Sequence, residues 1–172
     1  MYASVVDLAA LATAKGYKSD YSGFARKATG PQPKATNSIN SSNIDFNISS
    51  ALYNPHYTYD VNSNSYLRSE GGTPQMDANT GKQLAPKVVV AIVVPMSAGS
   101  KTAQGGSYSN YNPIGTGPAY IFQDGNLKQG TWNKASNTAQ ITFTDASGTV
   151  IAINPGQTWI SAVTDSSKVV YN

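Results

Sequence analysis

The central part of the chain alternates between apolar and polar residues with a period of two. The apolar positions are Ile44, Phe46 and Ile48 in one segment and Tyr57, Tyr59 and Val61 in a second. This alternation predicts half-buried strands, because successive side chains of a strand point to opposite faces of a sheet. Residues 62–64 are Asn-Ser-Asn, which predicts a hairpin turn. Residues 88–94 are apolar throughout and predict a central strand, buried on both faces and ended by Pro95.

Two further hairpins are expected downstream. The first turns at Asp124-Gly125, and the second turns between Asp145 and Gly148. A last strand is expected over residues 158–163, followed by a tail that is frayed or forms an edge strand. Residues 96–117 are rich in Gly, Ser and Tyr and are expected to form a long loop.

The N-terminal residues carry a helical pattern instead. Ser4 and Asp7 form a capping box, apolar residues repeat at a spacing of three to four, and Gly16 provides a stop. We expect this helix to pack on the sheet. Residues 17–43 contain Pro31 and Pro33 and a Ser/Asn run, which predict a surface connector. The predicted organisation is therefore a helix and connector over residues 1–43 and a β-rich domain over 44–172. The predicted fold class is α+β, a mainly antiparallel sheet or sandwich with one N-terminal helix packed on it.

Composition narrows the classes of function. The 172 residues contain no cysteine and one histidine, which excludes thiol nucleophiles and metal sites built on thiolates or several imidazoles, and no cofactor is expected. The net charge of +3 is carried by scattered residues, which does not favour nucleic-acid binding. No apolar run approaches the ~18 residues of a membrane helix, and residues 1–4 do not begin a signal peptide.

Several segments taken in order resemble one known family. They are the stretch 66–69, the Gly/Asn-rich insert with Asp77 and Gly81, the apolar run 87–94, and the segments 119–125, 130–132 and 154–160. In this order and spacing they resemble the C-terminal domain of the YerB-like family of bacterial lipoproteins, whose function is unassigned. The resemblance covers roughly residues 50–163 and extends more weakly to residues 2–17. It implies an extracytoplasmic domain that is membrane-anchored in the full-length protein, with a further N-terminal region and a lipoprotein signal.

Few residues offer catalytic chemistry. His56 would have to serve as the base for any serine nucleophile, but no nucleophile motif lies near it, so an exposed turn or strand position is favoured. Glu70 and Asp77 are the carboxylates that a cell-wall hydrolase would need. For Asp77 we favour a structural role, either capping its turn or pairing with Arg68. The Arg68–Asp77 pair is therefore the polar candidate site.

Eleven tyrosines form the remaining suggestive feature. Tyr57, Tyr59 and Tyr66 on one hairpin face could form a platform for sugars or peptides, although packing within the sheet is favoured. The predicted function is a non-catalytic extracytoplasmic domain that binds a protein or cell-wall component or acts as a scaffold. The alternatives are a carbohydrate-binding module that uses these tyrosines and a cell-wall hydrolase that uses Glu70 and Asp77.

Overall fold

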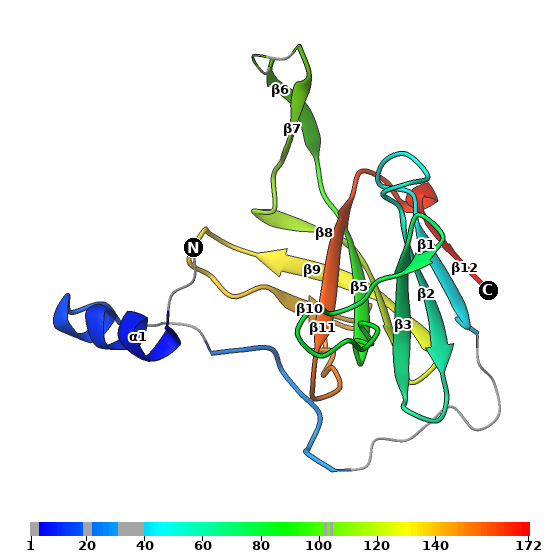
Figure 1. Ribbon diagram of the computed structural model, residues 1–172, viewed down its shortest axis with the longest axis horizontal. Helices are drawn as coiled ribbons and strands as arrows, with labels where there is room; N and C mark the ends of the chain where they lie inside the picture. Colours follow the sequence, from blue (N-terminus) through cyan, green and yellow to red (C-terminus); the bar gives the residue numbers. More distant parts are fainter. Residues whose placement is uncertain (1–3, 19–21, 31–39, 102, 104) are drawn as a thin grey trace.

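The computed structural model describes residues 4–18, 22–30, 40–101, 103 and 105–172. The strands form two five-stranded sheets and a separate two-stranded ribbon, and a short α-helix lies near the N-terminus (Figure 1). Among the named strands that the structure describes, pairing is antiparallel except between β5 and β11. The predicted α+β class with mainly antiparallel strands is confirmed.

The first sheet has the order β12-β1-β2-β3-β4. Its strands are β1 (Asn43–Phe46), β2 (Pro55–Asp60), β3 (Ser65–Glu70), β4 (Thr73–Pro74) and β12 (Val169–Tyr171). The predicted hairpin is present, because β2 and β3 pair with Tyr59 opposite Tyr66. Its turn contains Asn64 at φ 47°, a left-handed conformation that asparagine tolerates better than most residues. The C-terminal tail forms the edge strand β12, which follows a 3-10 turn (Ser166–Lys168).

The second sheet has the order β10-β9-β8-β5-β11. Its strands are β5 (Val88–Val93), β8 (Gly115–Gln123), β9 (Asn126–Lys134), β10 (Thr142–Thr144) and β11 (Thr158–Val163). Strand β5 lies between β8 and β11, so the predicted central strand is confirmed. Both predicted turns also form: Asp124 and Gly125 have φ 57° and 70°, and the Gly148 N–H donates to the Asp145 carbonyl at 2.9 Å.

Two hydrophobic cores meet at the second sheet. In the first core, Phe46 and Tyr57 from the first sheet lie in one buried cluster with Val89 and Phe122 from the second. The second core covers the opposite face of the second sheet, and its buried members are Val88, Val90, Ile92, Val94, Ala119, Ile121, Trp132, Phe143, Ile151 and Ile153. Strand β5 therefore contributes side chains to both cores, as its uninterrupted apolar sequence predicts.

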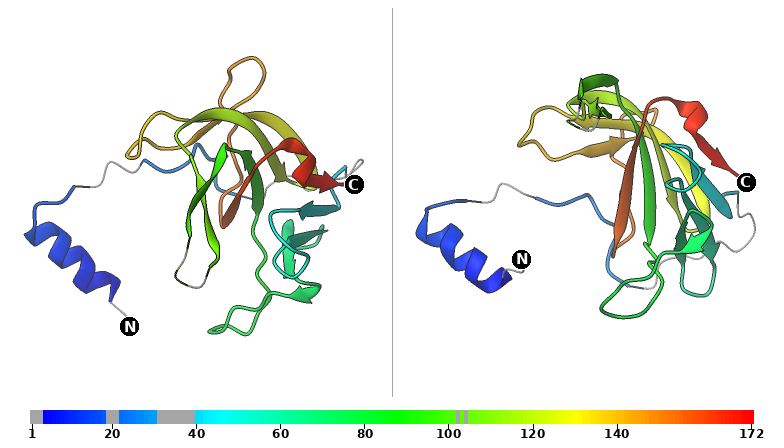
Figure 2. Two further views of the ribbon diagram at one scale, coloured as in Figure 1. Left: turned by 90° about the horizontal axis from the view of Figure 1, so that it is seen from above. Right: turned by 45° about the horizontal axis from the view of Figure 1, so that its top comes forward.

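Helix α1 (Val5–Ala14) does not pack on a sheet. The Ser4 Oγ accepts from the Asp7 N–H at 3.4 Å, so the predicted cap is present, but none of the helix residues is buried. Leu8 and Leu11 are 53% and 54% exposed, and Figures 1 and 2 show the helix apart from both sheets. The predicted packing is wrong. Within the described residues, core clusters lie on both faces of the second sheet, and the outer face of the first sheet carries polar residues such as His56, which do not favour packing of an apolar helix stripe.

The predicted loop over residues 96–117 is also wrong. In the part of the chain that the structure describes, strands β6 (Met96–Lys101) and β7 (Ser107–Tyr111) pair only with each other, and β8 begins at Gly115. The ribbon projects from the rest of the domain (Figure 1). It escapes prediction because both of its faces are solvated, so its sequence lacks the alternation of a half-buried strand.

Part of the predicted connector belongs to the β-rich domain. Arg26 forms a parallel bridge with Ile153, and the Phe24 ring stacks on Phe143 with centroids 6.2 Å apart. Residues 31–39, which include the two predicted connector prolines, lie outside the described residues.

Trp132 provides a test of the second core. Its indole is fully buried and its Nε1 donates to the Val93 carbonyl at 2.8 Å. Trp132→Ala should lower the free energy of unfolding by ~3–5 kcal/mol, because it leaves a cavity and an unpaired carbonyl. Tyr108→Ala, at a side chain that is 62% exposed, should change it by no more than ~0.5 kcal/mol. Urea unfolding measures both, and equal losses would contradict the assignment.

Candidate functional site

Arg68 does not pair with Asp77. Its side chain is 5% exposed, and its Nη2 donates to Glu70 Oε2 at 2.7 Å. The guanidinium lies over the Trp159 ring at 4.3 Å from the centroid and within 5.9 Å of the Tyr57 centroid. Residues two apart on a strand share a face, which explains why Glu70 is the partner. The predicted Arg68–Asp77 pair is therefore wrong, and Arg68 belongs to the packing between the sheets.

Asp77 caps its own turn, which is the role that the sequence favours. Its Oδ1 accepts from both the N–H and the Oγ1 of Thr80 at 2.8 Å, and the Gly81 N–H donates to its carbonyl at 2.9 Å. The hydrogen bonds from Thr80 lower the pKa of the Asp77 carboxyl. The acid of a glycosidase pair needs a raised pKa instead. Asp77 therefore does not suit the role of the acid in a Glu70/Asp77 hydrolase.

The three candidate tyrosines lie inside the domain. Tyr57, Tyr59 and Tyr66 are 0%, 9% and 0% exposed, and the last two rings pack with centroids 5.2 Å apart. Burial raises the pKa of Tyr57 to about 12, and the neighbouring Arg68 and Ser161 offset only part of this effect. These rings therefore pack within the core and cannot offer an exposed platform to a sugar.

His56 has partners that the sequence does not reveal. Its Nδ1 lies 2.8 Å from Asp45 Oδ1 on β1, and its Nε2 lies 3.1 Å from Thr58 Oγ1 on its own strand. Thr58, His56 and Asp45 are therefore arranged in the order of the nucleophile, base and carboxylate of a catalytic triad. A triad also needs donors for an oxyanion, and the backbone of both strands is paired within the sheet. We assign the three residues to a polar network on the outer face.

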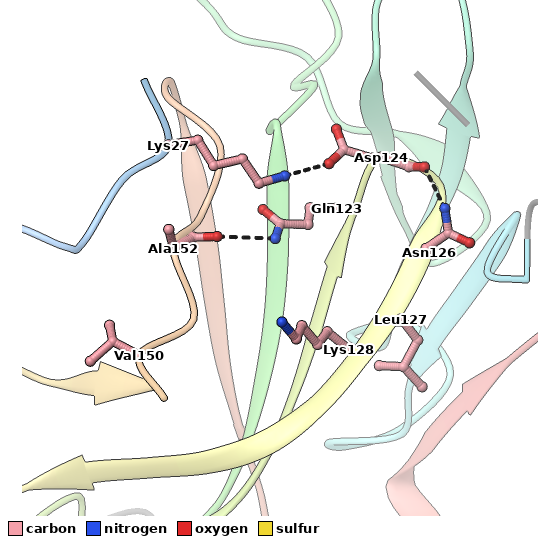
Figure 3. A pocket seen from close by; sticks show the side chains of 8 residues that line it. All are labelled: Lys27, Gln123, Asp124, Asn126, Leu127, Lys128, Val150 and Ala152. Carbon is pink, nitrogen blue, oxygen red and sulfur yellow. Dashed lines mark hydrogen bonds and ion pairs between the residues drawn. The ribbon is translucent and has the colours of Figure 1, made fainter. Parts of the chain in front are cut away.

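A pocket lies where three parts of the chain meet, beside the turn between β8 and β9 (Figure 3). Its volume is about 530 Å³, within the range of small-molecule sites. Gln123 helps to line it and is fixed at both ends: its Nε2 donates to the Ala152 carbonyl at 3.2 Å, and its Oε1 accepts from the Asn154 N–H at 2.9 Å. The pocket wall is therefore held by hydrogen bonds.

Asp124 links the segments around this pocket. Its Oδ2 forms an ion pair with Lys27 Nζ at 2.6 Å, and its Oδ1 accepts from Asn64 Nδ2 at 2.8 Å and Asn154 Nδ2 at 2.7 Å. Burial by itself would raise the pKa of Asp124, but the three hydrogen bonds and the Lys27 charge lower it. The Asp-Gly pair predicts the turn and not these partners, which come from distant parts of the sequence.

The other wall of the pocket combines apolar side chains with a lysine. Val150, which is 53% exposed, contributes an apolar side chain, whereas the Leu127 side chain packs against the core between the sheets. Lys128 directs its ammonium toward the middle of the residues drawn in Figure 3. The sequence gives no signal for this pocket.

Within the described ranges, no three His, Asp or Glu side chains gather as ligands for a metal ion, and no helix is long and apolar enough to cross a membrane.

Asp124→Asn tests the linking role of the carboxylate. Asparagine has nearly the same shape and tolerates the positive φ, but it removes the charge and replaces one acceptor oxygen with an NH2 donor, although all the partners of Asp124 at this site are donors. Because the pKa of Asp124 is lower in the folded protein, its contribution is present at neutral pH and is lost as pH falls through that lowered value. We expect Asp124→Asn to lower the free energy of unfolding by ~1–3 kcal/mol at neutral pH and by less near pH ~3, below the ordinary pKa of an aspartate.

The exposed turn residue Asp77 supplies the control, because Asp77→Asn leaves the pocket intact. Urea unfolding at both pH values measures the two variants. A loss from Asp124→Asn that is the same at both pH values would contradict an ionised, paired carboxylate.

Comparisons with known proteins identify the family of this chain, but they assign no activity to it. Residues 44–160 match the family described as "Protein of unknown function (DUF3048) C-terminal domain". The crystal structure of YerB from Bacillus subtilis is similar, with a TM-score of 0.67 and 24% sequence identity. That match covers 98% of this chain and 54% of YerB, so this chain spans about half the length of that protein. No curated protein matches. The chain belongs to the DUF3048 C-terminal domain family, and its fold is YerB-like.

Proposed function

We propose that this chain is a non-catalytic binding domain, and that the β6–β7 ribbon is the surface that contacts its partner, a protein or a cell-wall component. The observation that carries this proposal is the exposure of the ribbon. Met96, Tyr108 and Tyr111 are 45%, 62% and 38% exposed, and no residue of either ribbon strand is buried. Exposed aromatic side chains of this kind are favoured anchors at interfaces.

The architecture of the ribbon supports the same role. Among the strands that the structure describes, it pairs with no other, and a two-stranded hairpin alone is only marginally stable in water. A partner that covers one face would stabilise it. The ribbon carries little charge, because Lys101 is the one charged residue in the sequence from Met96 to Tyr111. This composition suits an uncharged amphipathic surface and does not suit nucleic acid.

We place the domain outside the cytoplasmic membrane, anchored through the rest of the full-length protein. The support for this location is the resemblance to bacterial lipoproteins, together with a surface rich in Ser, Thr and Asn and a chain without cysteine. Protease added to intact cells should digest the domain, whereas complete protection would contradict this location.

The two alternative functions have less support. A carbohydrate-binding module would need exposed rings, and Tyr57, Tyr59 and Tyr66 are buried. In a hydrolase built on Glu70 and Asp77, Asp77 would not suit the role of the acid, because hydrogen bonds from Thr80 lower its pKa. A scaffolding role remains compatible with the binding domain, because it uses the same exposed surface.

Tyr108→Ser tests the ribbon. The matched control is Tyr53→Ser, because Tyr53 is 61% exposed and lies outside the ribbon. Sedimentation with purified cell walls measures one class of partner, and photo-crosslinking from position 110 to extracytoplasmic proteins measures the other. Tyr108→Ser should weaken the binding at least ~10-fold in whichever assay detects a partner. Tyr53→Ser should bind like the wild type. Equal behaviour of both variants would contradict the assignment of the surface.

A further inference from the structure

Strand β11 is an edge of the second sheet, and no described strand pairs with its outer side. The carbonyls of Gln157 and Val163 accept from backbone N–H groups at or next to the two ends of β5. Because successive carbonyls of a strand point to opposite sides, the odd-numbered residues of β11 face β5. The residues whose N–H and C=O groups point away from β5 are Thr158, Ile160 and Ala162. Among the described residues, no hydrogen bond reaches these outward groups.

The other edges of the two five-stranded sheets offer much less backbone. Strands β12 and β10 have three residues each, and β4 has two, one of which is Pro74. Short edge strands and prolines keep the edges of sheets from pairing with other chains. Strand β11 has six residues, contains no proline and no charged residue, and pairs with β5 without a bulge. Such an edge is a template for another extended chain.

The side chains of β11 fit a second copy of the same strand. In antiparallel pairing about a two-fold axis at Ile160, Thr158 of one copy lies opposite Ala162 of the other. Trp159 then lies opposite Ser161, whose small side chain leaves room for the indole. Because β11 carries no charge, no like charges of the two strands meet across the axis.

The two ends of β11 carry opposite charges. Arg26 lies at the first end, where its Nη1 donates to Thr158 Oγ1 at 3.3 Å, and it forms no ion pair with a described residue. Asp165 follows the last end and is exposed. Antiparallel pairing brings the Arg26 end of each copy next to the Asp165 end of the other. This charge complementarity favours a second copy over an arbitrary peptide.

We propose that two copies of this chain form a dimer through antiparallel pairing of β11, which joins their five-stranded second sheets into one. The outward N–H and C=O groups of each copy are then paired with those of the other. The β6–β7 ribbon is separate from this sheet, so the inference does not rest on the proposed role of the ribbon.

Ala162→Pro tests the dimer. Sedimentation equilibrium of the wild type should show a monomer–dimer equilibrium with a Kd on the order of 0.1 mM, because edge pairing buries a small area. Proline removes the outward N–H of residue 162 and leaves the hydrogen bonds to β5, so it should raise Kd at least ~10-fold. The matched control is Ala162→Ser, which keeps the N–H and should dimerise like the wild type. Urea unfolding checks that both variants fold.

Amide hydrogen exchange of the wild type tests the same pairing without a substitution, and it decides alone if Ala162→Pro does not fold. The outward amides of Thr158, Ile160 and Ala162 should exchange ~4-fold faster at ~10 µM than at ~1 mM protein, which is the ratio of the monomer fractions for this Kd. The amides of Trp159 and Ser161 face β5 and should exchange equally at both concentrations.

Three results would overturn the proposal. They are a monomer at ~1 mM protein, a dimer whose Kd is unchanged in a folded Ala162→Pro variant, and outward amides whose exchange does not depend on protein concentration. The last result would mean that the edge of β11 is either open to water or covered within one chain.

Discussion

Burial of both faces of β5 is the constraint on which the rest of the domain depends. Val89 and Ala91 contribute to the core between the sheets, while Val88 and Val90 contribute to the core on the far side. Each fully buried valine contributes roughly 1.5–3 kcal/mol relative to an exposed one. The strand also pairs along both edges, with β8 and β11. A polar residue at any of these positions would bury a polar group without a hydrogen-bond partner in one of the two cores.

Polar contacts connect the segments that lie at the edge of these cores. Asp124 joins the N-terminal connector, the β2–β3 turn and the segment before Pro155 through Lys27, Asn64 and Asn154. These contacts also shape the pocket. Helix α1 has no buried residue, and large apolar side chains of α1 and of the β6–β7 ribbon are exposed. The domain thus combines a packed framework with two projecting segments.

The elements that follow local rules could be predicted from the sequence. The alternation around Tyr57 and Tyr59, the apolar run of β5 and the turns at Asp124 and Asp145 each depend on neighbouring residues alone. The packing of α1 could not be predicted, because an apolar stripe shows that a helix can pack without showing which surface is available. The ribbon could not be predicted either, because both of its faces are solvated and its sequence therefore lacks the alternation of a half-buried strand. The candidate site depends on register and distant contacts: Arg68 contacts Glu70 on its own strand, and Lys27 reaches Asp124 across 97 positions.

Native-state hydrogen exchange of the isolated chain tests most directly whether this division into framework and projections is correct. The amides of β5 should exchange through global unfolding, with an opening free energy equal to that from urea unfolding. The amides of α1 and of the β6–β7 ribbon should exchange through local opening that costs much less. Ribbon amides protected to the level of β5 would contradict the account, because the ribbon would then be part of the cooperative core.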